Sequence, residues 1–386
     1  MLLVMDKYFF IGNFSSNDYQ KSIANSSAGN QVQFQILNEI NKLGGTVNTI
    51  CYSMQPMPAW PKGDFIVRSK EESNIVFPSF INLPIIKNLF FALHLILFLL
   101  KYRPRFCIQY NSYLFENLAL LLYRFFFRKS RISIIIQDVN CDPVIKFQHL
   151  VNVKFLIERL GLYLLIYYDF LVPVSEELAL DFKFKKEKYF VFQGGMTSYS
   201  IQLLNSQLQE QSSDNKFAVF AGAIEPYNGL KKLIDQWTLQ EVKFPLHIFG
   251  RGSMSEYVKI KAKENQYIIY HGFQSEEIVE QWLLQAQWNF CLRYSIEINQ
   301  NYFFPSKFFN LICLKNTLIC NPFNNLPLSL QSFIVLIDDE LQNLSDIINS
   351  TVNKNRFDKS NLCIQTLFDH HSWETCINNL CKNLNV

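Results

Sequence analysis

The sequence predicts an α/β protein with two domains, each built around a mainly parallel β-sheet. Its 386 residues are too many for one ordinary domain and suit two of roughly 190 each. Short apolar segments alternate with helical patterns along the chain, which is typical of parallel α/β sheets. Hydrophobic residues make up 49% and charged residues only 18%, which excludes a disordered chain and indicates large cores.

The first half contains the predicted elements of one sheet. We expect strands at Tyr8–Ile11, Thr46–Tyr52, Cys107–Tyr110, Ile132–Gln137, Phe170–Val174 and Tyr189–Gln193. A polar loop, Gly12–Asn30, precedes a predicted helix at Gln31–Leu43. The apolar run Leu89–Leu100 is shorter than the 18 or more residues, roughly, that span a bilayer, so it predicts a buried or interfacial helix.

A second series of elements follows the polar segment Thr197–Lys216, which suits an inter-domain linker. The predicted strands are Phe217–Ala221, Leu246–Phe249, Tyr267–Tyr270, Trp288–Leu292 and Thr317–Cys320. The predicted helices are Leu230–Trp237, Met254–Glu264, Glu276–Ala286, Ser306–Lys315, Leu341–Ser350 and Ser360–Leu384. Two similar halves joined by one linker would place a ligand cleft between them.

Basic residues are concentrated in one segment of the first half. They are Lys101, Arg103, Arg105, Arg124, Arg128, Lys129 and Arg131, with Glu116 the one acid among them. A nucleic-acid-binding protein would usually spread its cations more widely. Cations interleaved with Phe and Leu favour an anionic membrane surface, with the rings Phe125–Phe127 at the headgroup boundary. The alternative is a helix end with its rings turned inward and its charges solvated.

Cysteine usage and the first residues favour a cytoplasmic protein. The nine Cys show no CxxC pair and no zinc spacing, which indicates free thiols in a reducing compartment. The first ten residues lack a basic n-region, a long apolar stretch and a cleavage site, so we expect no signal peptide. The His residues show no ligand spacing, and His370 and His371 are expected at the surface.

Glycines follow several predicted strands of the second half. Gly250 and Gly252 come directly after Leu246–Phe249, while Gly222 and Gly272 end two other strands. Glycine at a strand-to-helix turn lets backbone N–H groups approach an anion. Each glycine alone is also compatible with a simple tight turn. Several of them on the carboxyl edge of one sheet predict a nucleotide site.

Two cations are predicted to bind the same anion. Pro305 and Ser306 favour a helix start, which places Lys307 in the first turn of that helix. A cation there is unfavourable against the positive helix end unless an anion lies beside it. Arg293 follows the strand Trp288–Leu292 and could reach that anion, for which a diphosphate is the expected chemistry. Solvated Lys and Arg side chains are the alternative.

Polar residues of the first half are candidates for binding an acceptor. Asp138 lies at the end of a predicted strand and is either a catalytic or acceptor-binding carboxylate or a cap or turn residue. The loop Gly29-Asn30-Gln31 and the residues Asn111 and Tyr113 could hold hydroxyl groups of an acceptor.

Several segments together resemble a known family. FAVFAGAIEPYNGL (217–230), HIFGRG (247–252), YHGF (270–273) and FFPSKFFNLICLKNTLI (303–319) are similar to the donor-binding half of group 1 (family 4) glycosyltransferases with the GT-B fold. SIIIQDV (133–139), VPVSEEL (172–178) and QGGMT (193–197) resemble the acceptor half of bacterial surface-polysaccharide members. The resemblance covers nearly the full chain, and it rests on the order and spacing of the motifs.

The resemblance implies a GT-B architecture of two Rossmann-like domains facing a central cleft. Residues 1–200 would bind the acceptor, 201–365 the nucleotide sugar, and the helix at 366–386 would pack back toward the first domain. It also implies a retaining reaction without a required metal or other cofactor. No Asp-x-Asp occurs in the chain, which argues against the metal-dependent class.

The full sets of candidates combine the family's motifs with the strand-end and loop residues named above. Lys307, Arg293 and Asp138 are the catalytic candidates. The donor-binding candidates are Gly222, Asn228, Gly229, Gly250, Gly252, Gly272, Phe273, Ser306 and Asn310. The acceptor-binding candidates are Gly29, Asn30, Gln31, Asn111, Tyr113, Gly194 and Gly195. The chain departs from the family at its Glu-x7-Glu pair, because Tyr302 and Asn310 stand at those positions.

These observations favour a glycosyltransferase at the inner face of a bacterial cell membrane. It would transfer a sugar from a nucleotide sugar to a lipid-linked saccharide in capsule, exopolysaccharide or lipopolysaccharide synthesis, and it would contact anionic lipid through Lys101–Arg131. Two alternatives stay open: a non-catalytic scaffold of the same fold, which the missing Glu pair motivates, and a sugar-nucleotide epimerase.

Overall fold

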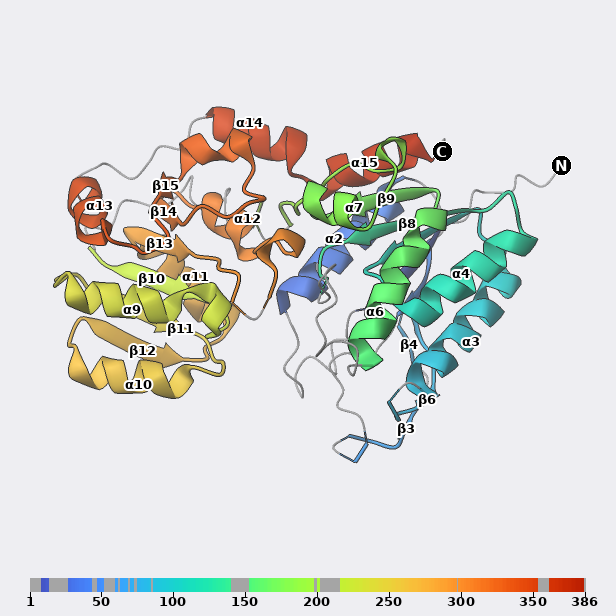
Figure 1. Cartoon of the computed structure of the whole chain (residues 1–386), viewed down its shortest axis with the longest axis horizontal. Helices are drawn as coiled ribbons and strands as arrows, with labels where there is room; N and C mark the ends of the chain where they lie inside the picture. Colours follow the sequence, from blue (N-terminus) through green and yellow to red (C-terminus); the bar gives the residue numbers. More distant parts are fainter. Residues whose placement is uncertain are drawn as a thin grey trace. The chain divides into compact units, whose positions relative to one another are not determined.

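The computed structural model describes residues 8–13, 27–43, 47–51, 60–61, 63–68, 70–72, 75–84, 86–139, 153–197, 200–201, 216–296, 298–352 and 361–384. The chain divides into two compact units (Figure 1). The first unit comprises Met1–Gln193 and Trp373–Val386, and the second comprises Gly194–Ser372. Each unit is built on a mainly or wholly parallel sheet, so the predicted α/β class is confirmed.

The first unit contains a seven-stranded sheet in the order β4-β5-β2-β1-β7-β8-β9. Its strands are β1 (Tyr8–Gly12), β2 (Val47–Cys51), β4 (Lys70–Glu72), β5 (Ile75–Phe77), β7 (Phe106–Tyr110), β8 (Arg131–Ile136) and β9 (Phe170–Pro173). Only the pairing of β4 with β5 is antiparallel among the described pairs of this sheet. The central strand β1 is buried along its whole length, as expected for a parallel strand covered on both faces. Strands β3 (Ile66–Val67) and β6 (Phe80–Ile81) form a separate antiparallel pair.

Helices cover both faces of this sheet (Figure 1). They are α2 (Ser27–Lys42), α3 (Ile86–Tyr102), α4 (Leu114–Phe126), α6 (Val153–Leu164), α7 (Glu176–Asp181) and α15 (Trp373–Asn383). Alternate residues of β1 face opposite sides: Tyr8 and Phe10 join the core formed with α2 and α15, while Phe9 contacts Tyr102 at the end of α3. Trp373 of α15 is fully buried against Phe192, with ring centres 4.9 Å apart. The last helix is therefore part of the first unit's core.

The second unit contains a six-stranded sheet in the order β12-β11-β10-β13-β14-β15, with every described pair parallel. Its strands are β10 (Ala218–Ala221), β11 (Leu246–Phe249), β12 (Ile268–Gly272), β13 (Trp288–Cys291), β14 (Thr317–Cys320) and β15 (Val335–Leu336). Its helices are α9 (Leu230–Leu239), α10 (Ser255–Glu264), α11 (Glu276–Gln285), α12 (Lys307–Ile312), α13 (Leu344–Thr351) and α14 (Asn361–His370). Trp237 and Trp288 are fully buried in its core.

Three predicted elements differ from the structure. Tyr189–Gln193 is not a ladder strand, because its backbone pairs with β9 through the single bridge from Tyr189 to Leu171 and one hydrogen bond from Phe192 to Pro173. The predicted loop Gly12–Asn30 is wrong at its end, because α2 already begins at Ser27. The predicted helix Ser360–Leu384 is two helices, α14 and α15, separated by His371 and Ser372. Most of the predicted linker Thr197–Lys216 lies outside the described residues.

Candidate functional site

Three strands of the second unit end in glycines that lie against one another. Gly222 donates its N–H to the carbonyl of Phe249 at 3.0 Å, and Gly250 donates to the carbonyl of Gly272 at 2.8 Å. These glycines have φ values of 145° for Gly222, 136° for Gly250 and 69° for Gly272, which side chains rarely allow. A Cβ at Gly250 would lie 1.9 Å from the oxygen of Gly222. The close backbone packing at this carboxyl edge therefore requires glycine at 250.

The loop after β11 is fixed to the loop after β10. A Cβ at Gly252 would lie 2.4 Å from the carbonyl oxygen of Ile224. The carboxylate of Glu225 accepts hydrogen bonds from the backbone N–H of Ser253 at 3.0 Å and from the Ser253 hydroxyl. Gly222 itself is exposed, although its N–H is already bonded to Phe249. The edge is thus a rigid, backbone-lined surface of the kind that binds phosphate groups.

Lys307, the first residue of α12, extends across this edge. Its Nζ lies 3.4 Å from the carbonyl oxygen of Ala221 and 4.4 Å from the ring centre of Phe220. A Cβ at Gly222 would lie 3.5 Å from the same Nζ. The Lys307 ammonium group is therefore adjacent to the glycine edge, as the sequence predicts.

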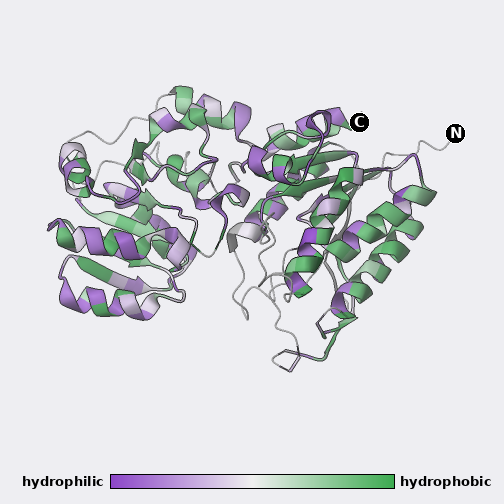
Figure 2. Ribbon diagram, viewed as in Figure 1, coloured by the Kyte–Doolittle hydropathy of each residue, from purple (hydrophilic) through white to green (hydrophobic). Residues whose placement is uncertain are grey.

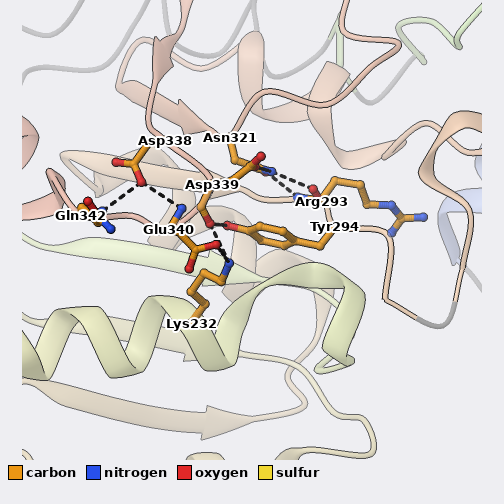
Figure 3. Close-up of polar contacts among 8 residues, drawn as sticks. All are labelled: Lys232, Arg293, Tyr294, Asn321, Asp338, Asp339, Glu340 and Gln342. Carbon is orange, nitrogen blue, oxygen red and sulfur yellow. Dashed lines mark hydrogen bonds and ion pairs between the residues drawn. The ribbon is translucent and has the colours of Figure 1, made fainter.

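Arg293 follows β13 and is held from several directions. Its guanidinium donates to Oδ1 of Asn228 at 3.1 Å and lies 4.8 Å from the ring centre of Tyr227. The Asn321 side chain accepts from the Arg293 backbone N–H at 2.7 Å and donates to the Arg293 carbonyl at 2.8 Å (Figure 3). Asp339 accepts a second hydrogen bond from Asn321 at 2.8 Å. Arg293 is therefore a buried cation with a fixed backbone.

The electrostatics of this edge favour an anion. Burial lowers the pKa of Lys307; the thiols of Cys291 and Cys320 oppose this effect, and the positive charge of Arg293 adds to it. No Asp or Glu among the described residues contributes to the pKa of Lys307. Two neighbouring cations at a glycine-lined edge are a suitable site for a diphosphate, whose charge would oppose their mutual repulsion.

The other predicted donor-binding residues have different roles in the structure. Asn228 has both ends of its amide engaged, because its Nδ2 donates to the carbonyl of Ala223 at 2.8 Å and its Oδ1 binds Arg293. Gly229 packs against Tyr294, whose ring would lie 2.3 Å from an added Cβ. Asn228 therefore orients Arg293, while Gly229 allows close packing.

Three more donor-binding candidates differ in exposure and in how many of their polar atoms are free to bind a ligand. Phe273 is exposed, with the Arg251 guanidinium 4.5 Å from its ring centre. Ser306 is exposed and makes no capping hydrogen bond. Oδ1 of Asn310 accepts from the Ser200 hydroxyl at 2.5 Å. The amide oxygen of Asn310 is therefore already engaged by a neighbouring side chain, and its Nδ2 could still donate to a ligand hydroxyl.

A polar cluster lies at the carboxyl edge of the first unit's sheet. Asn111, just after β7, has φ of 58° and accepts from the backbone N–H groups of Gln137 at 2.8 Å and Asp138 at 3.2 Å. It thereby joins the ends of β7 and β8 and fixes the start of the Asp138 loop. Asp138 is exposed. Burial raises the pKa of Tyr113, and the charges of Glu116 and Asp138 raise it further.

Asn13 also belongs to this cluster, although the sequence analysis did not predict it. Its Nδ2 donates to the Tyr113 hydroxyl, and its backbone N–H donates to the Gln33 side chain at 2.6 Å. Gln33 donates in return to the Asn13 carbonyl at 2.9 Å. The buried Oδ1 of Asn13 has no hydrogen-bond partner within the described part of the chain. An unpartnered acceptor in a buried position suits a hydroxyl donor of a ligand.

The remaining acceptor candidates are placed differently from the prediction. Gly29, Asn30 and Gln31 belong to the first turns of α2 and not to a loop, since α2 begins at Ser27. Asn30 is buried there. Gly194 and Gly195 are buried and belong to the second unit.

Asn321 and Glu225 are further site residues that the sequence analysis missed. Asn321 follows β14 directly, and a search for polar residues at strand ends would have found it. Glu225 lies three residues after Gly222, in the loop that this glycine begins. His, Cys, Asp and Glu side chains form no group of three or more suited to a metal within the described residues.

Comparisons with known proteins give matches at the level of structure. No family model matches the sequence, and no curated protein matches it. HepE from Anabaena in complex with UDP is 13% identical with a TM-score of 0.62, over 98% of this chain and 99% of that chain. The catalytic domain of starch synthase IV from Arabidopsis thaliana, bound to ADP and acarbose, is 10% identical with a TM-score of 0.64, over 98% of each chain.

An α,α-trehalose-phosphate synthase (UDP-forming) from Burkholderia xenovorans, in complex with glucose-6-phosphate, is 9% identical with a TM-score of 0.66. That match covers 98% of this chain and 100% of the other. These full-length likenesses show that the chain has the GT-B fold with two Rossmann-like domains, which confirms the predicted fold. Membership of family 4 and the surface-polysaccharide type remain predictions.

Proposed function

We propose that the chain is a retaining glycosyltransferase that uses a nucleotide-sugar donor and needs no metal. Its acceptor would be a lipid-linked saccharide in capsule, exopolysaccharide or lipopolysaccharide synthesis at the cytoplasmic face of a bacterial membrane. Within the described residues no helix has both the length and the apolar character to cross a bilayer. Association with the membrane would therefore be peripheral for this part of the chain.

The pair of cations at the glycine edge is the observation that carries the proposal. Lys307 lies beside exposed Gly222 and is close enough to Arg293 to be repelled by its charge, and no Asp or Glu among the described residues offsets the cost of burying Lys307. A nucleoside diphosphate would supply the missing negative charge. Its charge grows as the bond to the sugar breaks, so the same cations would stabilise the leaving group more in the transition state than in the ground state. Structures similar to this chain were determined with UDP or ADP bound.

A non-catalytic scaffold of the same fold is the second candidate, and two residues favour it. Tyr302 is fully buried at the position where the family has the first Glu of its pair. Asn310, at the second position, has its amide oxygen occupied by the Ser200 hydroxyl. A carboxylate is therefore missing from both places where the family would bind the sugar or ribose hydroxyls.

A thermal-unfolding screen with UDP, GDP, dTDP and CMP tests donor binding. A nucleotide present at about 100 times its dissociation constant should stabilise the protein by roughly 2.7 kcal/mol. Incubation of the stabilising nucleotide's sugar conjugates with and without lipid extract then separates the candidates. Transfer or slow hydrolysis, unaffected by EDTA, indicates a transferase, and turnover without an acceptor to another sugar nucleotide indicates an epimerase. Nucleotide binding without any turnover would favour the scaffold, and no binding of any nucleotide would contradict the proposal.

A further inference from the structure

Helix α3 exposes a stripe of leucines along its whole length. Phe91, Leu95 and Leu99 are buried against the sheet, as their spacing of four predicts. The opposite face is also apolar: Leu93 is 53% exposed and Leu97 is 55% exposed. The full set of large apolar side chains exposed on α3 is Ile86, Leu89, Leu93, Leu97 and Leu100. A helix in water usually presents polar residues on this outer face, so α3 lacks the expected solvent-facing side.

The neighbouring helices continue the apolar surface. Helices α3, α4 and α6 lie side by side in the first unit (Figure 1). Hydrophobic residues predominate along α3 and α4 (Figure 2). The exposed apolar residues of α4 are Leu118, Leu122, Phe125 and Phe126, and those of α6 and the turn after it are Val153, Leu160, Tyr163, Ile166 and Tyr167. We call the exposed residues of these three helices the apolar layer. Soluble proteins rarely expose so extended an apolar surface unless it binds something.

Cations flank one end of the apolar layer. Helix α3 leads into β7 and α4 leads into β8, so both helices end at the amino edge of the sheet. A hydrogen bond of 2.8 Å from the Arg131 N–H to the Arg105 carbonyl joins the two segments. Lys101, Arg103, Arg128 and Lys129 are exposed there and make no ion pair with any described residue. They form the free part of the basic segment that the sequence indicated.

Two other cations of that segment are part of the fold. Asp169 Oδ1 accepts from Arg124 at 2.8 Å and from Arg131 at 3.1 Å. Phe127 is also held, because its ring is 4.7 Å from that of Tyr123. Phe125 and Phe126, in contrast, are 68% and 70% exposed. The ring of Phe127 is therefore turned inward, as in the alternative of a helix end, whereas Phe125 and Phe126 stay exposed.

We propose that the apolar layer and the cations Lys101, Arg103, Arg128 and Lys129 form a docking surface for an anionic lipid bilayer. The leucines and Phe rings would enter the headgroup boundary, while the cations would bind lipid phosphates at its edge. The complementarity of charge favours lipid over a second copy of this chain. A second copy would place the same cations near one another or on apolar surface, whereas anionic lipid neutralises them.

The direction of α3 relates the docking surface to the polar cluster of the first unit. Because α3 runs opposite to the parallel strands, its first turn with Ile86 and Leu89 lies toward the carboxyl edge. Asn13, Asn111 and Asp138 are at that carboxyl edge. A bilayer along α3 would therefore border both edges of the sheet. This last step rests on the proposed function, since it makes the cluster accessible to a lipid-linked acceptor, but the docking surface does not.

Flotation with lipid vesicles tests the docking surface. One set of vesicles is neutral phosphatidylcholine, and the other is an anionic, equal mixture of phosphatidylcholine and phosphatidylglycerol. Wild-type protein should bind the mixed vesicles, and binding should weaken as salt rises. The triple variant Lys101→Gln, Arg128→Gln, Lys129→Gln should bind about a hundredfold more weakly. The double variant Leu93→Gln, Leu97→Gln should lose about tenfold or more. All five exchanged positions are exposed, so Arg124, Arg131 and the core stay unchanged.

Matched variants in the second unit provide the controls. Lys216→Gln, Lys243→Gln, Lys263→Gln removes the same number of exposed charges, and Leu239→Gln, Leu328→Gln removes two exposed leucines. Control variants that lose binding as strongly as the test variants would overturn the proposal. So would equal binding to both vesicle types, or a wild-type dimer that only the leucine variant dissociates. The thermal shift with UDP, GDP, dTDP and CMP, measured for every variant, reports on the proposed donor site separately. The absence of a shift with all four nucleotides would contradict that site and not the docking surface.

Discussion

The side-chain amide of Asn321 mimics a neighbouring strand for the backbone of Arg293. It accepts the Arg293 N–H at 2.7 Å and donates to the Arg293 carbonyl at 2.8 Å, beyond the last ladder pair of β13 and β14. Asp339 fixes the same amide through a third contact of 2.8 Å (Figure 3). The position of the Arg293 guanidinium therefore depends on a residue that itself need not touch a ligand.

Replacing Asn321 by Ala should weaken nucleotide binding through loss of this orientation. Both backbone groups of Arg293 would lose their partner, and an unsatisfied buried polar group costs about 1–3 kcal/mol. We expect a lower thermal midpoint together with at least roughly tenfold weaker UDP or GDP binding by calorimetry. Asn321→Asp separates the two backbone contacts, because a carboxylate can accept from the N–H but cannot donate to the carbonyl. Unchanged nucleotide affinity in both variants would mean that Asn321 does not position Arg293 for a ligand.

Replacing Lys307 by Ala should affect activity and stability in opposite ways. Removing one charge that stabilises a leaving group typically lowers turnover by roughly 10²–10³-fold. The unliganded protein should unfold at the same or a higher temperature, because burial lowers the pKa of Lys307 and its ammonium group is costly to bury without an anion. Sugar-nucleotide turnover and thermal midpoints measure the two effects. Lys259→Ala, an exposed position on α10, is the control, and full activity in Lys307→Ala would exclude its assigned role.

Ala substitutions at two glycines should separate backbone strain from steric overlap. Gly250→Ala combines φ of 136° with a Cβ placed 1.9 Å from the Gly222 oxygen, so we expect a loss of more than about 3 kcal/mol or failure to fold. Gly272→Ala has φ of 69° but no atom within 4 Å of its Cβ, so the cost should be near 1 kcal/mol. Denaturant unfolding compares them, and equal losses would mean that the glycine edge is less tightly packed than described.

The glycine edge could be predicted from the sequence because each residue follows its own strand directly. Arg293 obeys the same rule, since parallel strands bring their carboxyl ends to one edge. Lys307 does not follow a strand directly and was predicted instead from the helix start at Pro305 and Ser306. Asn321 obeys the strand-end rule too and was missed only because no family motif marks it. Strand ends are thus the positions where sequence order alone brings distant residues together.

Other features depended on packing that the sequence does not display. The start of α2 at Ser27 is supported by Gln33, which binds the Asn13 backbone twenty residues earlier. The apolar run predicted a buried or interfacial helix, and α3 is such a helix. The run did not show that one face of α3 is uncovered, because hydropathy does not distinguish core from exposed apolar surface. His371 was expected at the surface and is instead only 5% exposed.

The buried position of His371 predicts that stability falls in mild acid. Its ring nitrogens have no hydrogen-bond partner among the described residues, and its ring lies 5.6 Å from that of Phe309. Burial, together with the charge of His370, lowers the pKa of His371 to about 4. The unfolded value is about 6.5, so between these two pH values the unfolded state binds more protons and the free energy of unfolding decreases as pH falls. The contribution of this one group reaches about 3 kcal/mol at the lower limit of the window.

Urea unfolding between pH 4 and pH 7 should therefore show a shallower pH dependence of stability in His371→Leu than in wild type. Exposed His370→Gln should retain most of the wild-type pH dependence. His247 titrates in the same window, since burial and the charge of His271 lower its pKa to about 4, so the variant should keep part of the slope. A pH profile identical to wild type in His371→Leu would show that the ring is hydrated in solution and not buried as a neutral side chain.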